Sequence, residues 1–238
     1  MIMDFKQAYE TIVKRSVERN TKEIPTILSC LDFEGKECLD ANPKSGARLA
    51  IQLVGFVKSI VCLEKDPEIV QSIRSAINKN GFQKKISIQK YKEGEFPFKD
   101  NTFDLVYYAW GSHKNLTDPK FLDELARVSR KYILLIMAGT EGDEPKLLEI
   151  TRKDERKRRK EIKETISNYL QLKGLKVNYK EEILRLEFQD EQEIYETFKC
   201  LAFKNENLGE KDEKVKKFLS SRVKNFQDSF YCLVAEKT

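Results

Sequence analysis

Short apolar runs alternate with longer amphipathic stretches through the first half of the chain. Such runs predict strands of a parallel sheet, whose two faces are both covered. The predicted strands lie at residues 38–40, 59–63, 86–90, 105–109 and 131–137. Parallel neighbours need crossover connections, which the stretches between the runs supply as helices. The pattern therefore predicts an α/β fold with a doubly wound sheet.

The second half adds two strands and several helices. Residues 176–188 predict a sixth strand, and residues 229–235 predict a last strand that enters antiparallel beside it. A long helical stretch runs from the loop at 141–145 to about Lys173. We expect a Rossmann-like seven-stranded, mostly parallel sheet with an antiparallel last strand. Its domain would span residues 35–238 with a helical insertion at about 190–225, and residues 1–34 would form an N-terminal helical cap.

Composition narrows the class of protein. Hydrophobic residues make up 40% and charged residues 35% of the 238 positions, as in a charged globular protein rather than a disordered one. The five cysteines form no CxxC pair, which favours a reducing cytoplasm over secretion. We see no signal sequence and no apolar run of about 18 residues, so we expect no membrane span.

Several kinds of site are disfavoured. One histidine and scattered cysteines leave no metal cluster, so we predict no metal site. A GxxxxGK[ST] phosphate loop is missing, and the segment NPKSGA does not supply the GxGxxG of nicotinamide dehydrogenases.

Residues 36–66 form a strand–turn–helix–strand unit that suggests a ligand site. Asn42, Pro43 and Gly46 suit a sharp turn after the first strand, and Glu64 closes the second strand. An acid at this point can accept both hydroxyls of a ribose, while the turn faces the rest of a nucleotide-like ligand.

Three motifs resemble those of the class I S-adenosylmethionine-dependent methyltransferases, in particular the type 11-like family. Leu39-Asp40-Ala41 occupies the LD(I/V) positions of a first motif that reads roughly (V/L)LD(I/V)GCGTG. Residues 64–68 occupy the second motif, an acid followed by a run such as DxSPE. Residues 96–104, FPFKDNTFD, resemble the PF(x)DxxFD stretch before strand four. The resemblance implies a methyltransferase that uses S-adenosylmethionine.

The resemblance also implies which residues bind the cofactor. In it, Asp40 orders the first turn and the methionine amino group, Glu64 binds the ribose, and residues near the other strand ends frame the adenine and the methionine. The expected cofactor-binding residues are Asp40, Asn42, Gly46, Glu64, Lys65, Glu93, Ala109 and Trp110. Asn42 and Lys44 stand where the family has glycines, so that either Lys44 points to solvent or cofactor binding is weak or absent.

Catalysis would be mainly positional, because methyl transfer needs an aligned nucleophile more than an acid or base. His113 is a candidate base, since the pKa of an imidazole lies near neutrality. The acceptor, expected near Trp110, is left open between a small molecule, a protein and RNA. The competing hypothesis is a non-catalytic methyltransferase-like binding or scaffold protein.

Residues 151–164 contain eight basic and four acidic side chains. This segment is compatible with nucleic acid, but a solvated helix face with ion pairs four residues apart is favoured.

Overall fold

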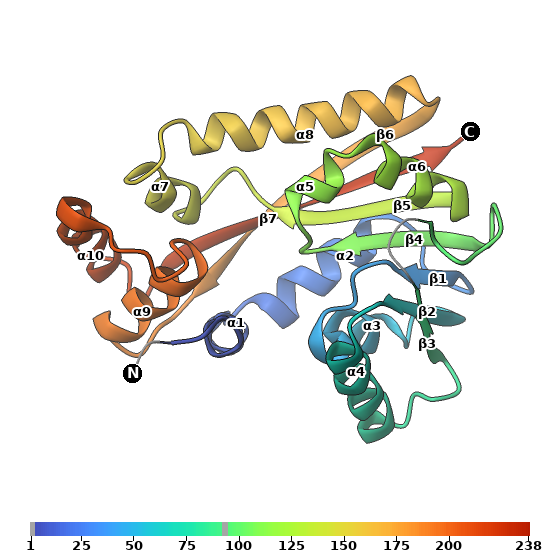
Figure 1. Ribbon diagram of the computed structural model, residues 1–238, viewed down its shortest axis with the longest axis horizontal. Coiled ribbons are helices and arrows are strands. Elements are labelled where there is room, and N and C mark those ends of the chain that lie inside the picture. Colours follow the sequence, from blue (N-terminus) through green and yellow to red (C-terminus); the bar gives the residue numbers. More distant parts are fainter. Residues whose placement is uncertain (1–2, 92–94) are drawn as a thin grey trace. The chain divides into compact units, whose positions relative to one another are not determined.

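The computed structural model describes residues 3–91 and 95–238 (Figure 1). These residues form a seven-stranded sheet in the order β3-β2-β1-β4-β5-β7-β6, in which only β7 is antiparallel to its neighbours. The fold class expected from the sequence is therefore confirmed. The strands are β1 Glu37–Asp40, β2 Ser59–Glu64, β3 Ile86–Lys90, β4 Phe103–Ala109, β5 Ser129–Ala138, β6 Leu175–Leu186 and β7 Phe226–Lys237.

Helices connect these strands and precede β1. The α-helices are α1 Phe5–Arg15, α2 Ile24–Cys30, α3 Arg48–Leu53, α4 Pro67–Asn80, α5 His113–Leu116, α6 Pro119–Val128, α7 Glu144–Glu149, α8 Glu155–Leu172, α9 Glu191–Leu201 and α10 Asp212–Ser220. Short helices of other types are the π-helix η1 Arg19–Glu23 and the 3₁₀-helices η2 Ser45–Ala47 and η3 Gly209–Lys211. The helical stretch expected up to Lys173 is divided into α7 and α8, and Asp154 takes a positive φ just before α8.

The chain divides into two compact units. One, which we call the sheet unit, comprises residues 27–137, 162–180 and 231–238, and the other, the helical unit, comprises residues 3–26, 138–161 and 181–230. The N-terminal cap and the domain boundary at residue 34 stay predictions.

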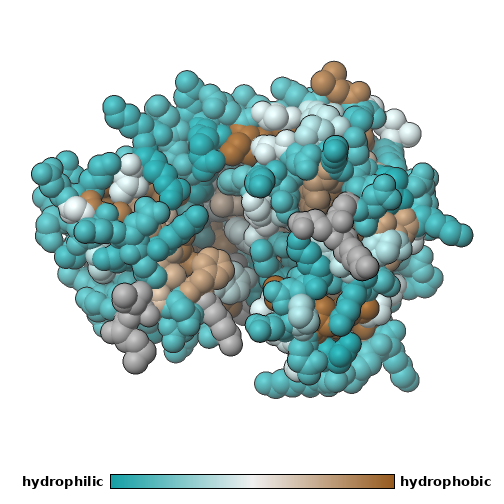
Figure 2. Space-filling view, viewed as in Figure 1, coloured by the Kyte–Doolittle hydropathy of each residue, from teal (hydrophilic) through white to brown (hydrophobic). Residues whose placement is uncertain are grey.

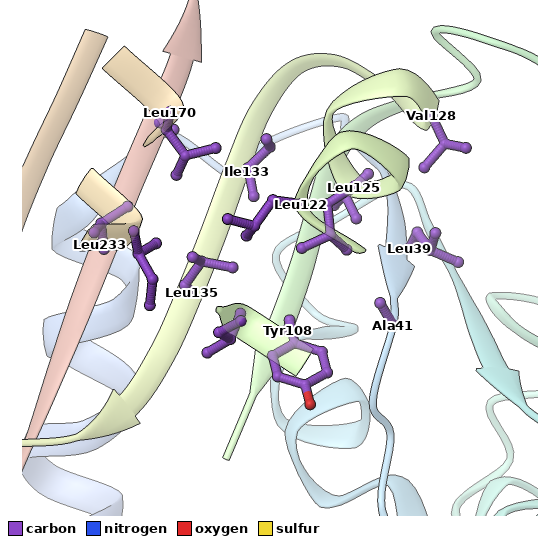
Figure 3. Packing of buried hydrophobic residues seen from close by; sticks show 14 of the residues in the cluster. Leu39, Ala41, Tyr108, Leu122, Leu125, Val128, Ile133, Leu135, Leu170 and Leu233 are labelled. Atoms are coloured by element: carbon purple, nitrogen blue, oxygen red, sulfur yellow. The ribbon is translucent and has the colours of Figure 1, made fainter. Parts of the chain in front are cut away.

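An apolar core of the sheet unit is shown in Figure 3. Strand side chains alternate between the two faces of a sheet. Leu39 of β1 and Leu135 of β5 therefore meet Leu125 of α6 and Leu170 of α8 in this core. Figure 1 shows α3 and α4 on the other side of β1–β3. Because both faces are covered, the loops at the carboxyl edge remain to receive a ligand.

The helical unit has its own core, formed by α1, α7, α9, α10 and the parts of β6 and β7 in this unit. Phe198 and Phe226 stack there with ring centroids 4.3 Å apart. Outside the cores, polar and charged side chains dominate the face that Figure 2 shows. This surface agrees with the high share of charged residues.

Candidate functional site

Asp40 ends β1 at the carboxyl edge of the sheet. Its side chain is 1% exposed, and its Oδ1 accepts a hydrogen bond from the Asn42 backbone N–H at 3.1 Å. Burial raises the pKa of this carboxyl to about 7, although the hydrogen bond from Asn42 opposes the rise. A buried carboxyl with a strongly shifted pKa at a sheet edge is typical of a functional site.

The turn after Asp40 has an unusual backbone. Lys44, Gly46 and Ala47 all have positive φ, and Lys44 lies at φ 55°, ψ 171°. That region is open essentially only to glycine and costs another residue about 1–3 kcal/mol. Positions 42, 44 and 46 are those at which the first motif has glycine. The turn therefore keeps a glycine-like path at position 44 although the residue there is lysine.

Asn42 ties this turn to the end of β4. Its Nδ2 donates a hydrogen bond to the backbone oxygen of Ala109 at 2.6 Å. β1 and β4 are parallel neighbours, with Asp40 opposite Tyr107. A glycine at position 42 would lack this bond, so the asparagine fixes the turn across the point at which the strand order reverses.

Glu64 ends β2 beside the same turn. Its Oε1 accepts the backbone N–H groups of Lys65 at 2.7 Å and Asp66 at 3.0 Å. Asp66 in turn caps α4 by accepting the N–H of Glu68 at 2.8 Å. The start of α4 therefore fixes the Glu64 carboxylate at the carboxyl edge of the sheet.

A cavity of about 420 Å³ lies at this edge. This volume is in the usual range for small-molecule sites. It brings together Asn42, Glu64 and Lys65 of the expected residues. The residues that line it are Ala41, Asn42, Leu63, Glu64, Lys65, Tyr91, Phe96, Tyr108, Asn115, Asp118, Lys120 and Phe121.

One wall of the cavity is aromatic. The rings of Tyr108 and Phe121 meet edge to face at 5.0 Å, and those of Tyr91 and Phe96 at 5.9 Å. Tyr91, Tyr108 and Phe121 are not among the site residues expected from the sequence. The sequence feature that could have indicated them is an aromatic residue near the carboxyl end of β3, Tyr91, and another near that of β4, Tyr108.

Tyr108 is held in place by the chain that follows it. Its hydroxyl accepts the N–H of Ser112 at 2.9 Å and Nδ2 of Asn115 at 3.1 Å. A Cβ on Gly111 would overlap Cζ of the Tyr108 ring. A side chain at position 111 would therefore displace the ring, which makes this glycine a packing requirement of the site.

The other expected site residues lie around the cavity without lining it. Gly46 is in η2, Ala109 accepts the Asn42 bond, and Trp110 has a φ of 54° while its N–H bonds the Ile136 oxygen at 2.8 Å. His113 begins α5 and is partly buried. Glu93 lies outside the described residues.

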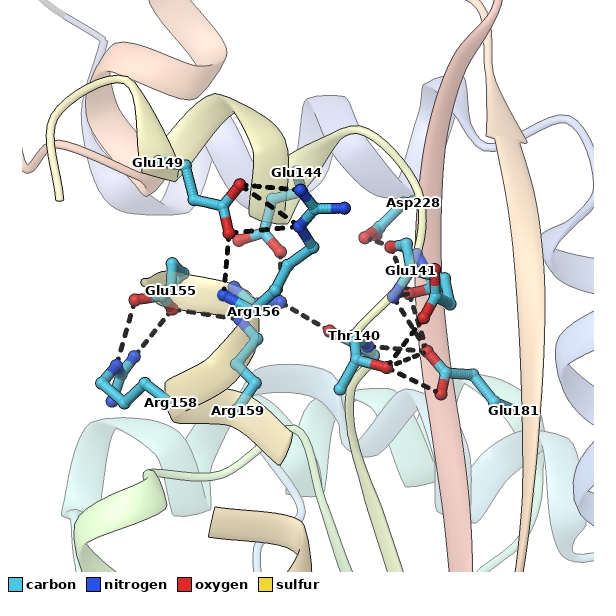
Figure 4. A network of polar contacts seen from close by, with 12 residues as sticks. Thr140, Glu141, Glu144, Glu149, Glu155, Arg156, Arg158, Arg159, Glu181 and Asp228 are labelled. Atoms are coloured by element: carbon cyan, nitrogen blue, oxygen red, sulfur yellow. Dashed lines mark hydrogen bonds and ion pairs between the residues drawn. The ribbon is translucent and has the colours of Figure 1, made fainter. Parts of the chain in front are cut away.

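Arginines of the basic segment 151–164 pair with acids of the helical unit (Figure 4). Arg156 meets Glu149 at 3.1 Å, and Arg158 meets Glu155 at 2.7 Å. The nearly buried Arg159 meets Glu144 at 2.7 Å and Glu155 at 3.0 Å. Three of its arginines therefore serve the fold of the helical unit.

Metal binding and membrane insertion find no support in residues 3–91 and 95–238. These residues contain no group of histidines, cysteines and acids arranged to hold a metal ion. Nor do they contain a helix that is both long and apolar enough to cross a membrane.

Comparison with known proteins finds similarity to methyltransferases. Residues 45–136 match the family model described as a methyltransferase domain. No curated protein matches the chain significantly. Among solved structures, a candidate methyltransferase from Bacillus halodurans has a TM-score of 0.61 at 16% identity, over 90% of this chain and 98% of its own.

Two further structures have the same fold. A SAM-dependent methyltransferase from Aquifex aeolicus has a TM-score of 0.52 at 16% identity, over 95% of this chain and 97% of its own. A precorrin-6y C5,15-methyltransferase from Geobacter metallireducens has a TM-score of 0.54 at 16% identity, over 91% and 88%. Residues 45–136 therefore resemble a methyltransferase domain, and the chain shares the fold of these structures.

Proposed function

We propose that this protein binds S-adenosylmethionine in the cavity at the carboxyl edge of its sheet and transfers the methyl group to an acceptor near the end of β4. The observation that supports this most is that one cavity joins the strand-one turn, the acid that closes β2 and an aromatic wall. These are the contacts that an adenosine with an amino-acid tail requires.

The residues present fit this cofactor. The flat rings of Tyr91 and Tyr108 offer a surface for the adenine base. The Glu64 carboxylate is an acceptor for two ribose hydroxyls, as in other nucleotide sites of this topology. Asp40, Asn42 and Gly46 belong to the turn that faces the methionine tail. Glu93, which lies outside the described residues, stays a proposed adenine contact.

Methyl transfer needs little help from an acid or a base. S-adenosylmethionine supplies, when bound, a methyl carbon attached to a positively charged sulfur. The protein's share is to hold the acceptor in line with that carbon, and such positioning can contribute a large part of a rate enhancement. We place the acceptor beside Ala109 and Trp110, with His113 as a candidate base for acceptors that must lose a proton.

We also propose that the protein acts in the cytoplasm. All five of its cysteines are free thiols. Free thiols persist where the compartment is reducing.

Calorimetric titration with S-adenosylmethionine and S-adenosylhomocysteine tests the proposal. We expect both ligands to bind the wild type and to raise its melting temperature, since a ligand of the native state stabilises it. A Glu64→Gln variant should bind both ligands about 10- to 100-fold more weakly, because it loses a charged acceptor for the ribose hydroxyls.

Glu68→Gln is the matched control. It makes the same change of charge on the exposed first turn of α4, and Glu68 does not line the cavity. If neither ligand binds the wild type, the non-catalytic binding or scaffold hypothesis replaces the enzyme. If Glu64→Gln and Glu68→Gln bind equally well, the cavity is not the cofactor site.

A further inference from the structure

A second cavity lies at the amino edge of the sheet unit, where the parallel strands β1, β4 and β5 begin and the antiparallel β7 ends. We call it the amino-edge cavity. Its volume is about 570 Å³, within the usual range for small-molecule sites, and it shares no described lining residue with the cavity at the carboxyl edge. The described residues that line it include four cations, Lys36, Arg130, Lys131 and Lys237, and two acids, Glu34 and Asp104.

The four cations come from segments that are far apart in the sequence. Lys36 precedes β1, Arg130 and Lys131 lie at the start of β5, and Lys237 is the last residue of β7. The order and direction of the strands bring these ends together at one edge. Because like charges repel one another, an anion bound among these side chains would be favoured by their charge.

Lys237 has no acidic partner. Its Nζ donates hydrogen bonds to Oδ1 of Asn101 at 3.0 Å and to the backbone oxygen of Ser129. Both acceptors are neutral, and Lys237 forms no ion pair with any residue in the ranges 3–91 and 95–238. An ammonium has three N–H groups, so one remains for a ligand. The two bonds therefore fix a half-buried cation at the cavity and leave its charge unmatched.

Arg130 contacts the same part of the chain and keeps free donors. Its Nη2 donates to the backbone oxygen of Thr102 at 3.2 Å, and its Nη1 pairs with Oδ1 of Asp104. The other oxygen of Asp104 accepts the backbone N–H of Glu37 at 2.9 Å, so this acid is occupied by the start of β1 as well. A guanidinium has five N–H groups, and the half-exposed Arg130 can therefore bind a further acceptor.

The other two cations lie near the ring of Tyr132. Nζ of Lys131 is 5.0 Å from the ring centroid, and Nζ of Lys36 is 5.6 Å from it. Each of these lysines has an acid nearby, Glu236 at 3.4 Å from Lys131 and Asp32 at 3.7 Å from Lys36. Ion pairs that involve exposed groups are weak, so both ammoniums remain able to bind an anion.

We propose that the amino-edge cavity binds a small molecule that carries a diphosphate group. Phosphate oxygens are strong acceptors for ammonium and guanidinium donors. Lys237 and Arg130 bind one phosphate, and Lys36 and Lys131 bind the other. This site is separate from the proposed cofactor site at the carboxyl edge, so the inference does not depend on the proposed function.

Calorimetric titration of the full chain with inorganic pyrophosphate at constant ionic strength tests this proposal. Wild type should bind pyrophosphate about 10-fold more tightly than orthophosphate, because the second phosphate meets the second pair of cations. Lys237→Gln should weaken pyrophosphate binding about 10-fold, since it removes the cation without an acidic partner. Lys131→Gln should weaken it about 3-fold, because the Lys131 side chain is 53% exposed and water screens its charge.

Two variants with the same change of charge are the controls. Lys79→Gln lies in the exposed last turn of α4, and Lys120→Gln lies at the carboxyl-edge cavity. Neither lysine lines the amino-edge cavity, so both variants should bind pyrophosphate as wild type does. The melting temperature of each variant without ligand shows that it is folded. If Lys237→Gln does not fold, the exposed Lys131→Gln still tests the proposal.

Four outcomes would overturn the inference. The first is a wild type that does not bind pyrophosphate, and the second is unchanged binding in the folded variants of Lys237 and Lys131. The third is an equal loss in a control, because a loss in Lys79→Gln would assign the binding to net charge and a loss in Lys120→Gln would assign it to the other cavity. The fourth is tighter binding of a uridine hexanucleotide than of pyrophosphate, since the cations would then contact a nucleic-acid backbone.

Discussion

Asp40→Asn should stabilise the protein at neutral and alkaline pH. The carboxyl is 1% exposed, and burial raises its pKa from 3.8 to about 7. Between these two values the folded protein holds a proton that the unfolded chain has released. The stabilising contribution of Asp40 is therefore complete below pH 3.8, falls as the pH rises, and is lost above about pH 7.

The size of the effect follows from the shift. Each unit of pKa corresponds to about 1.4 kcal/mol, so the ionised carboxyl costs up to about 4 kcal/mol above pH 7. Asparagine keeps an oxygen that can accept the Asn42 N–H and has no charge to bury. From pH 5 to pH 8 the variant should gain about 2.5 kcal/mol in unfolding free energy relative to wild type.

Urea unfolding of both proteins at unit steps from pH 5 to pH 8 measures this difference. The difference is the useful quantity, because groups that titrate alike in both proteins cancel. Asp104 and Glu124 have lowered pKa values, so their stabilising contribution is present above their ordinary values of 3.8 and 4.5 and is lost only at lower pH. For Asp104, hydrogen bonds and the charge of Arg130 outweigh a rise from desolvation, and for Glu124 the bond from Arg127 is the largest cause. A difference that stays constant from pH 5 to pH 8 would refute the raised pKa of Asp40.

Three further predictions concern the site and one thiol. Asn42→Gly removes the bond to the Ala109 oxygen, so we expect a loss of about 1 kcal/mol in urea unfolding with S-adenosylhomocysteine binding retained. Gly111→Ala should lower the unfolding free energy by about 1–3 kcal/mol, because its Cβ would overlap the Tyr108 ring, whereas no change would show that the ring can move aside. Cys30 should be the first cysteine alkylated by iodoacetamide, since the neighbouring Cys232 thiol lowers its pKa and it is partly exposed; earlier labelling of another cysteine in a peptide map would contradict this.

The sheet could be predicted well because its signal is local. Each buried strand of the first half, such as β5, has apolar residues on both faces, and Asp66-Pro67 marks the start of α4 by its capping chemistry. The two compact units had no such signal. Their boundaries fall inside α2, β5, α8, β6 and β7, where the secondary structure continues unbroken and only long-range packing separates the units.

The cavity was predictable only in part. Asn42, Glu64 and Lys65 follow the ends of strands one and two, so their meeting follows from parallel pairing. Tyr108 gave no comparable signal, because an aromatic residue inside an apolar strand is expected to pack in the core. Its place at the cavity depends on Gly111 and Asn115, which fix the ring from the next loop.

The strand-one turn shows why a motif can be altered in sequence while its backbone persists. The family match begins at residue 45. Asn42 and Lys44, which stand where the motif has glycine, lie just before it. Positive φ at Lys44 and Gly46 keeps part of the glycine path, and the Asn42 bond to Ala109 holds the turn against β4. A comparison of residues finds two glycines replaced, whereas the backbone conformation at positions 44 and 46 and the position of Asn42 at the cavity are kept. The side chains of the turn therefore differ from the motif while its path at the carboxyl edge of the sheet persists.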